Sequence, residues 1–119
     1  MADYVSLYTY QNDVSVSFAV EDPKIMALGE KLKALCPDAY MNGYNWDVLF
    51  RYYLEQYEPD VLEGLDPDPE AGSCVVHWPL SPENEARARR FEEIIRSLIE
   101  GEETLCRLVE DNGGEIEWD

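Results

Sequence analysis

The side chains best suited to nucleophilic chemistry in this sequence are one imidazole and three thiols. His77 is the only histidine, and the cysteines are Cys36, Cys74 and Cys106. Residues three apart in a strand point to opposite faces, so a strand over 73–78 would separate Cys74 from His77 and exclude a local dyad. Pairing of His77 with either other cysteine stays open. We expect a non-catalytic histidine and cysteines that are buried as small hydrophobic residues.

Metal binding has little support in the spacing of the possible ligands. The sequence has no C-x₂-C pair of the kind that zinc sites use. Asp66, Asp68 and Glu70 imitate the opening of a calcium loop, which requires glycine at position 6 and a bidentate acid at position 12. Those positions hold Ala71 and His77. The sequence therefore predicts no metal site and no cofactor, and leaves only a weak, nonspecific divalent site as an alternative.

Motifs that mark common catalytic sites are missing from the chain. It contains no G-x-x-x-x-G-K-[ST], no G-x-G-x-x-G and no G-x-S-x-G. Carboxylates are so numerous that no pair stands out as the acid and base of a hydrolase. The prediction is a protein that is not an enzyme, with a small enzyme as an alternative.

The charge balance indicates a protein partner. The 119 residues include 26 acids and 9 bases, a formal net charge of −17, and residues 36–86 hold 11 of the acids with Arg51 as the only base. Phosphate backbones and anionic lipids attract cationic surfaces, so nucleic-acid binding and membrane docking are excluded. The same segment is rich in tyrosine and tryptophan, which form contact surfaces. A basic partner is the natural complement, although acidity can serve solubility alone.

Length and composition predict one domain over residues 1–119 in the cytoplasm. Hydrophobic residues make up 45% of the chain, enough for an ordinary core. No apolar run approaches the roughly 20 residues that span a bilayer. The first ten residues, MADYVSLYTY, lack the basic and apolar regions of a signal peptide. Three widely spaced cysteines fit a reducing compartment.

Hydrophobic periodicity places the elements of the N-terminal half. Alternation predicts strands over 4–10 and 14–20, joined as a hairpin, whose second face of tyrosine and serine is either covered or exposed for contact. Asp22-Pro23 predicts a helix start. An amphipathic aromatic helix follows, with Asn45 as its expected N-cap and Asp47 on its solvent side. Its apolar stripe comprises Trp46, Leu49, Phe50, Tyr53, Leu54 and Tyr57.

The C-terminal half completes an α+β prediction. The patterns indicate a loop or tight turn over 66–72, a strand over 73–78, a helix from Ser81-Pro82 that breaks at Gly101, and a stop at Gly113-Gly114. One long helix through Gly101 is an alternative, and residues 115–118 either form a strand or fray. We expect a small, mainly antiparallel sheet, made by the hairpin and the central strand, packed with three to four helices.

Two short motifs, in order, carry a family resemblance. Gly43-Tyr44-Asn45-Trp46 opens the aromatic helix, and Asp68-Pro69-Glu70-Ala71-Gly72 precedes the central strand. Together with the acidic C-terminal helix, they resemble the immunity protein 51 family of bacterial polymorphic toxin systems over residues 40–110. Ser73 departs from the bulky apolar residue expected there, and the tail 115–119 looks additional.

The resemblance implies a protein that binds and inactivates a cognate toxin and performs no catalysis. It implies structural roles for Gly43, Trp46, Pro69 and Gly72, and we expect both glycines to supply backbone conformations with positive φ. Expected toxin contacts are Asp66, Asp68, Glu70, Tyr44, Tyr52 and Glu55. If the toxin is a basic nuclease, the carboxylates among these residues would bind where the phosphates of its substrate bind. A generic interaction module is the alternative, and the oligomeric state stays open.

Overall fold

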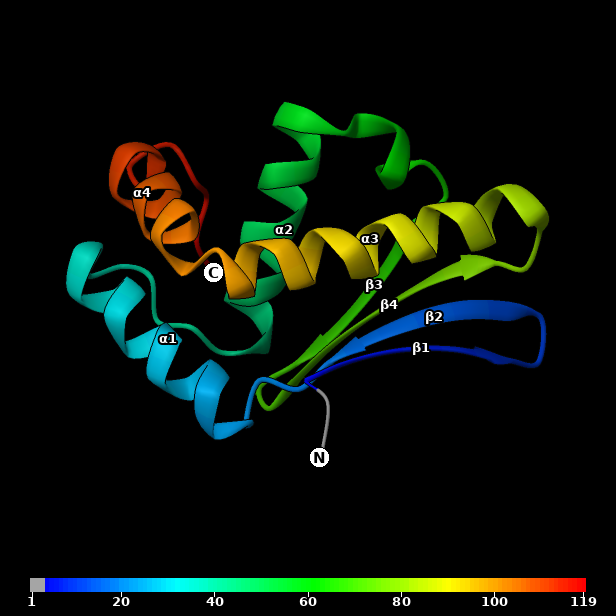
Figure 1. Cartoon of the computed structure of the whole chain (residues 1–119), viewed down its shortest axis with the longest axis horizontal. Coiled ribbons are helices and arrows are strands. Elements are labelled where there is room, and N and C mark those ends of the chain that lie inside the picture. The colour runs from blue at the N-terminus through cyan, green and yellow to red at the C-terminus, as the bar shows by residue number, and fades with distance from the viewer. Residues whose placement is uncertain (1–3) are drawn as a thin grey trace.

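The computed structural model describes residues 4–119, which form one four-stranded sheet and four α-helices (Figure 1). The elements in chain order are β1 (Val5–Tyr10), β2 (Asp13–Phe18), α1 (Pro23–Leu35), α2 (Gly43–Tyr57), the 3₁₀ turn η1 (Pro59–Leu62), β3 (Asp66–Glu70), β4 (Ser73–Pro79), α3 (Pro82–Glu100) and α4 (Glu102–Asn112). The sheet order is β1-β2-β4-β3 and every pairing is antiparallel. The predicted α+β architecture is confirmed.

The N-terminal hairpin forms as predicted. β1 and β2 pair from Val5 opposite Phe18 to Tyr10 opposite Asp13, so only Gln11 and Asn12 form the turn. Gln11 has a positive φ of 55°, the backbone conformation that tight two-residue hairpin turns require. The apolar residues of β2 are buried, which fixes the register of the sheet against the core.

The predicted loop over 66–72 is wrong, because residues Asp66–Glu70 form the edge strand β3. Only Ala71 and Gly72 remain as the turn to β4. Pro67 and Pro69 suggested a loop, but an edge strand tolerates proline where the missing N–H would point away from its neighbour.

Helix termini follow the predicted signals at α1 and α3. The Asp22 carboxylate accepts a hydrogen bond from the Lys24 amide at 2.9 Å, and the Ser81 hydroxyl accepts one from the Asn84 amide at 3.1 Å. Gly101 separates α3 from α4, so the prediction of two helices is confirmed.

The predicted cap of α2 is wrong by one turn. Asn42 caps the helix, since its side-chain oxygen accepts from the Asn45 amide at 3.0 Å. Asn45 is buried, and its side chain donates to the Tyr40 carbonyl at 2.8 Å and accepts from the Asp119 amide at 2.7 Å. Residues 115–119 form no strand and lie along α2.

Aromatic rings fill the core between the sheet and α2 and α3. The Phe50 ring centroid lies 5.1 Å from that of Phe18, 5.6 Å from Trp46 and 5.7 Å from Phe91. Asp47, predicted on the solvent side, is 2% exposed. Its carboxylate pairs with the Arg51 guanidinium at 2.7 Å, because one helical turn separates the two residues.

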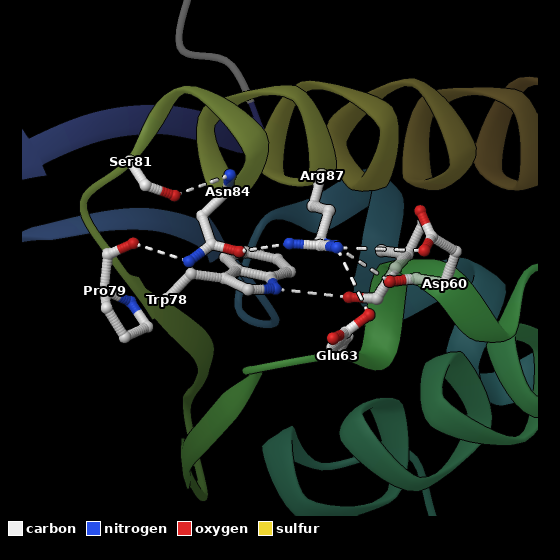
Figure 2. Close-up of polar contacts among 8 residues, drawn as sticks. Asp60, Glu63, Trp78, Pro79, Ser81, Asn84 and Arg87 are labelled. Carbon is white, nitrogen blue, oxygen red and sulfur yellow. Dashed lines mark hydrogen bonds and ion pairs between the residues drawn. The ribbon is translucent and has the colours of Figure 1, made fainter.

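A polar cluster ties η1 to α3 and β4, as Figure 2 shows. The Arg87 guanidinium donates to the Asn84 side-chain oxygen at 2.7 Å, to the Asp60 carbonyl at 3.0 Å and to the Glu63 carboxylate at 3.3 Å. Beneath it, the Trp78 indole donates to the Val61 carbonyl at 3.2 Å. These contacts fix the connection that leads from α2 into β3.

Replacing Arg87 with alanine is expected to lower the free energy of unfolding by about 1–2 kcal/mol, since hydrogen bonds from a charged donor on a mostly covered side chain are lost. Urea denaturation followed by circular dichroism measures the change. Arg107→Ala is the matched control, because that exposed guanidinium pairs with the exposed Glu103, and its loss should cost less than about 0.5 kcal/mol. Equal effects of the two substitutions would contradict a fastening role for Arg87.

Candidate functional site

One face of the sheet carries no helix within residues 4–119. α2 and α3 pack against the other face, which holds Val14, Val16 and Trp78 (Figure 1). Because side chains alternate along a strand, the register assigns the outward positions. These positions, which we call the open sheet face, are Ser6, Tyr8, Tyr10, Asp13, Ser15, Ser17, Asp66, Asp68, Glu70, Ser73, Val75, His77 and Pro79. The tyrosine and serine face of the hairpin is thus exposed for contact, one of the two predicted possibilities.

The open sheet face is negative. Its outward positions include no lysine or arginine, and its four carboxylates belong to Asp13, Asp66, Asp68 and Glu70. All four residues are exposed. Three of them come from β3, where alternate residues are about 7 Å apart along the strand, so β3 presents a row of evenly spaced carboxylates.

The basic residues are engaged elsewhere. Within residues 4–119, seven of the nine form ion pairs with acids outside the open sheet face. The pairs are Lys24–Glu100, Lys31–Glu102, Arg51–Asp47, Arg87–Glu63, Arg90–Glu58, Arg96–Glu92 and Arg107–Glu103. These seven cations therefore pair with acids of the helices and their connections, and none of these ion pairs involves a β3 carboxylate.

His77 lies near the centre of the open sheet face, on β4, between side chains of β2 and β3. Its Nδ1 lies 2.7 Å from the Ser15 hydroxyl and its Nε2 lies 3.6 Å from the Asp68 carboxylate. Ser15 is 1% exposed, because Tyr8 and His77 flank it in register on both sides. A substrate carbonyl therefore has no access to the Ser15 hydroxyl, and the hydrogen bond between this hydroxyl and Nδ1 orients the imidazole.

Cys74 and His77 lie on opposite faces, as predicted. Cys74 is buried in the core, and burial raises the pKa of its thiol far above the usual range, so the sulfur stays protonated. Cys36 and Cys106 are only partly buried, so the prediction of buried cysteines is correct for Cys74 alone. Within residues 4–119, no group of three or more metal-ligating side chains could hold an ion.

Three of the six predicted contact residues lie outside the open sheet face. Tyr44 is 40% exposed in the first turn of α2. Tyr52 and Glu55 line a groove of about 450 Å³ between α2 and the C-terminal segment, together with Glu115 and Glu117. Burial, followed by the charge of Glu115, raises the pKa of the Tyr52 hydroxyl. The structure thus brings Asp66, Asp68 and Glu70 together and places the other three elsewhere.

The motif residues join α2 to the β3–β4 turn. The Gly43 amide donates to the Ala71 carbonyl at 2.9 Å. A Cβ on Gly43 would lie 1.7 Å from the Glu70 carbonyl oxygen and 2.3 Å from that of Ser73. The expected positive φ is wrong for both glycines, because Gln11 and Gly64 alone have it among residues 4–119. Gly43 is needed because two backbones come into contact there.

Two further motif residues, Trp46 and Pro69, lie on the core side of the sheet. Trp46 is fully buried, and Pro69 lies opposite Cys74 on the inner face of the sheet. Gly72 is less constrained than Gly43, since a Cβ there would meet only the flexible Glu21 carboxylate, at 2.9 Å. The motif therefore fixes the β3–β4 hairpin, and with it the row of carboxylates.

Sequence reasoning missed Tyr8, Tyr10, Ser15 and His77 as members of this face. The alternation of the hairpin showed that tyrosine and serine share a face. That this face joins the acids of β3 depends on the strand order, which places β4 between the hairpin and β3. No local pattern in the sequence carries that information.

A model of a known protein family matches most of the chain. The family model described as immunity protein 51 matches residues 5–113, from the first residue of β1 to the residue after α4. No curated protein and no solved structure matches the chain significantly. No helix within residues 4–119 is long and apolar enough to cross a membrane. The match includes both motifs and all four strands.

Proposed function

Because the chain belongs to the immunity protein 51 family, we propose that it binds a cognate toxin with a basic surface and neutralises it through the open sheet face. The function needs no catalysis, and it places the protein in the cytoplasm of the cell that it protects. A nuclease is the kind of toxin that fits best, since nucleases bind phosphates through basic surfaces.

The row of β3 carboxylates is the observation that carries this proposal. Asp66, Asp68 and Glu70 are exposed and face the same way, and no lysine or arginine occupies an outward position on the sheet. Complementary charge steers association and favours the correct partner. Toxin cations that normally bind phosphates would meet carboxylates here instead.

Rigidity of the face supports the same proposal. The β3–β4 turn packs on the backbone of Gly43, and a hydrogen bond from Gly43 to Ala71 fastens it. Tyr8 and Tyr10 are 41% and 66% exposed, so their rings offer contact area next to the polar centre. A preformed surface loses little conformational entropy on binding, which favours tight association.

A growth assay tests the proposed function. The C-terminal domain of the protein encoded directly upstream of this gene is expressed with and without the protein, as the candidate toxin domain. We expect the domain alone to stop growth and the protein to restore it. A toxic domain whose effect persists in the presence of the protein would contradict the proposal, as would a neighbouring domain without toxicity.

The salt dependence of toxin association tests whether charge attraction drives binding, as the proposed function requires. Between ionic strengths of about 0.01 M and 1 M the screening length falls from about 30 Å to 3 Å. We expect the association rate constant of protein and toxin to fall at least tenfold over this range, because steering by charge supplies a factor of 10 or more. Stopped-flow fluorescence measures the rate. An association rate that does not change with salt would rule out a charge-driven interface.

A further inference from the structure

The two edges of the sheet differ in their capacity to accept another strand. At the β3 edge, the hydrogen-bond ladder fixes which main-chain N–H and C=O groups face outward. The Leu80 amide donates to the Asn12 carbonyl at 2.8 Å, so alternation directs the main-chain groups of Val76 toward β2. Pro67 lies opposite Val76, and Pro69 lies opposite Cys74, two residues further along the same alternation. The main-chain groups of both prolines therefore point away from β4.

Proline has no N–H, so the free side of β3 lacks donors at both of these positions. Carboxylates of Asp66, Asp68 and Glu70 flank the same edge. Prolines and charges are the devices by which sheets prevent unwanted pairing. The β3 edge is closed to strand addition.

The β1 edge has the opposite character. The Ala19 amide donates to the Tyr4 carbonyl at 2.8 Å, so alternation turns the N–H and C=O groups of Leu7 and Thr9 away from β2. The strand VSLYTY contains no charge, no proline and no glycine. Within residues 4–119, no helix or loop supplies a hydrogen bond to the outward groups of Leu7 and Thr9.

A pocket of about 240 Å³ lies beside this edge. Leu7, Thr9 and Val14 line it from the sheet, and Glu85 and Arg89 line it from α3. A strand added to β1 would place alternate side chains over this pocket and the others beside Tyr8 on the open sheet face. The edge thus has both the hydrogen-bonding groups and the side-chain site that recognition by strand addition uses.

We propose that the β1 edge pairs with an extended segment of the toxin, which becomes a fifth strand of the sheet. This inference rests on the proposed function and specifies how the partner docks. The net charge of −17 favours a basic segment and disfavours a second copy of this chain. The sheet is about 14 Å wide from β1 to β3, so one toxin surface can contact both the β1 edge and the β3 carboxylates.

Thr9→Pro tests the pairing directly. Proline removes an outward N–H and leaves the hydrogen bonds to β2 intact, and the Thr9 side chain is exposed. We expect at least about tenfold weaker binding to the purified upstream toxin domain by calorimetry, since one main-chain hydrogen bond is lost and the pyrrolidine ring blocks the edge. The control Thr9→Val keeps the N–H and should bind within about twofold of the wild type.

Amide hydrogen exchange of the wild-type protein gives a readout that does not depend on the variant folding. In the free protein, the amides of Leu7 and Thr9 should exchange fast and that of Tyr8 slowly. Saturation with the toxin domain should protect Leu7 and Thr9. Unchanged exchange of these two amides in the complex would overturn the inference, as would wild-type affinity of a folded Thr9→Pro variant.

The outcomes separate the two proposals. A wild-type protein that neither rescues growth nor binds the toxin domain overturns the proposed function and this inference together. Tight binding with unprotected Leu7 and Thr9 amides overturns the strand pairing alone. If the free protein sediments as a dimer with these amides already protected, the occupant of the edge is a second copy, and the toxin pairing is wrong.

Discussion

Replacing Gly43 with alanine is expected to lower the free energy of unfolding by about 3–5 kcal/mol. The added Cβ would lie 1.7 Å from the Glu70 carbonyl oxygen and 2.3 Å from that of Ser73. Both atoms belong to main chain that the sheet holds in place, so the hairpin or α2 must move and the hydrogen bond from Gly43 to Ala71 is lost. The cost exceeds ordinary overpacking because no side chain can rotate away.

Chemical denaturation measures this loss, which is a large share of the stability of a typical domain. Gly114→Ala is the matched control, because a Cβ there meets nothing within 4 Å, and a change below about 0.5 kcal/mol is expected. A Gly43→Ala protein that unfolds at the wild-type midpoint would show that α2 and the β3–β4 turn do not meet as described.

Reversing the charge of the β3 row is expected to weaken toxin binding about a thousandfold. The variant is Asp66→Lys, Asp68→Lys and Glu70→Lys combined. Each reversal replaces an attraction with a repulsion and is expected to cost about 1.4 kcal/mol or more of binding free energy, a factor of ten. The three residues are exposed on an edge strand, where lysine is well tolerated, so the fold should persist.

The control for this variant has the same net charge with a different placement. Glu30, Glu110 and Asp111 are exposed on α1 and α4, and their combined change to lysine should leave affinity within about tenfold of the wild type. Surface plasmon resonance of both variants on the toxin domain compares them. Similar losses for the two would show that net charge matters and that the open sheet face has no special role.

Local signals predicted the elements that local chemistry determines. Asp22 and Ser81 cap their helices as expected. The side-chain oxygen of each residue accepts a hydrogen bond from a backbone N–H in the first turn of the helix, which proline begins. Gly101 ends α3 where expected. These outcomes depend on residues within four positions of one another, so the sequence alone was sufficient.

Tertiary context decided the elements that were predicted wrongly. Asn42 caps α2 and Asn45 is buried, because Asn45 bonds the carbonyl of Tyr40 and the amide of Asp119, 74 residues away. Asp47 is buried against Arg51 although its position on the helix indicated solvent. The contact of Asn45 with Asp119 and the burial of Asp47 depend on the packing of distant segments, which periodicity does not describe.

The candidate site was predictable in part for the same reason. Asp66, Asp68 and Glu70 stood out by composition. Their common orientation followed only once β3 was seen as a strand. The partnership of His77 with Ser15 and Asp68 requires β4 to lie between β2 and β3, and that order of strands has no signature in the sequence.

The contrast between the two sheet edges also limits how large an assembly can grow through them. Fibrils form when each added molecule presents a fresh edge to the next one. Here Leu7 and Thr9 offer one receptive side, while Pro67 and Pro69 remove the donors from the other. Pairing at β1 therefore terminates after a single event, and the exposed strand that serves recognition cannot seed open-ended polymerisation of the protein.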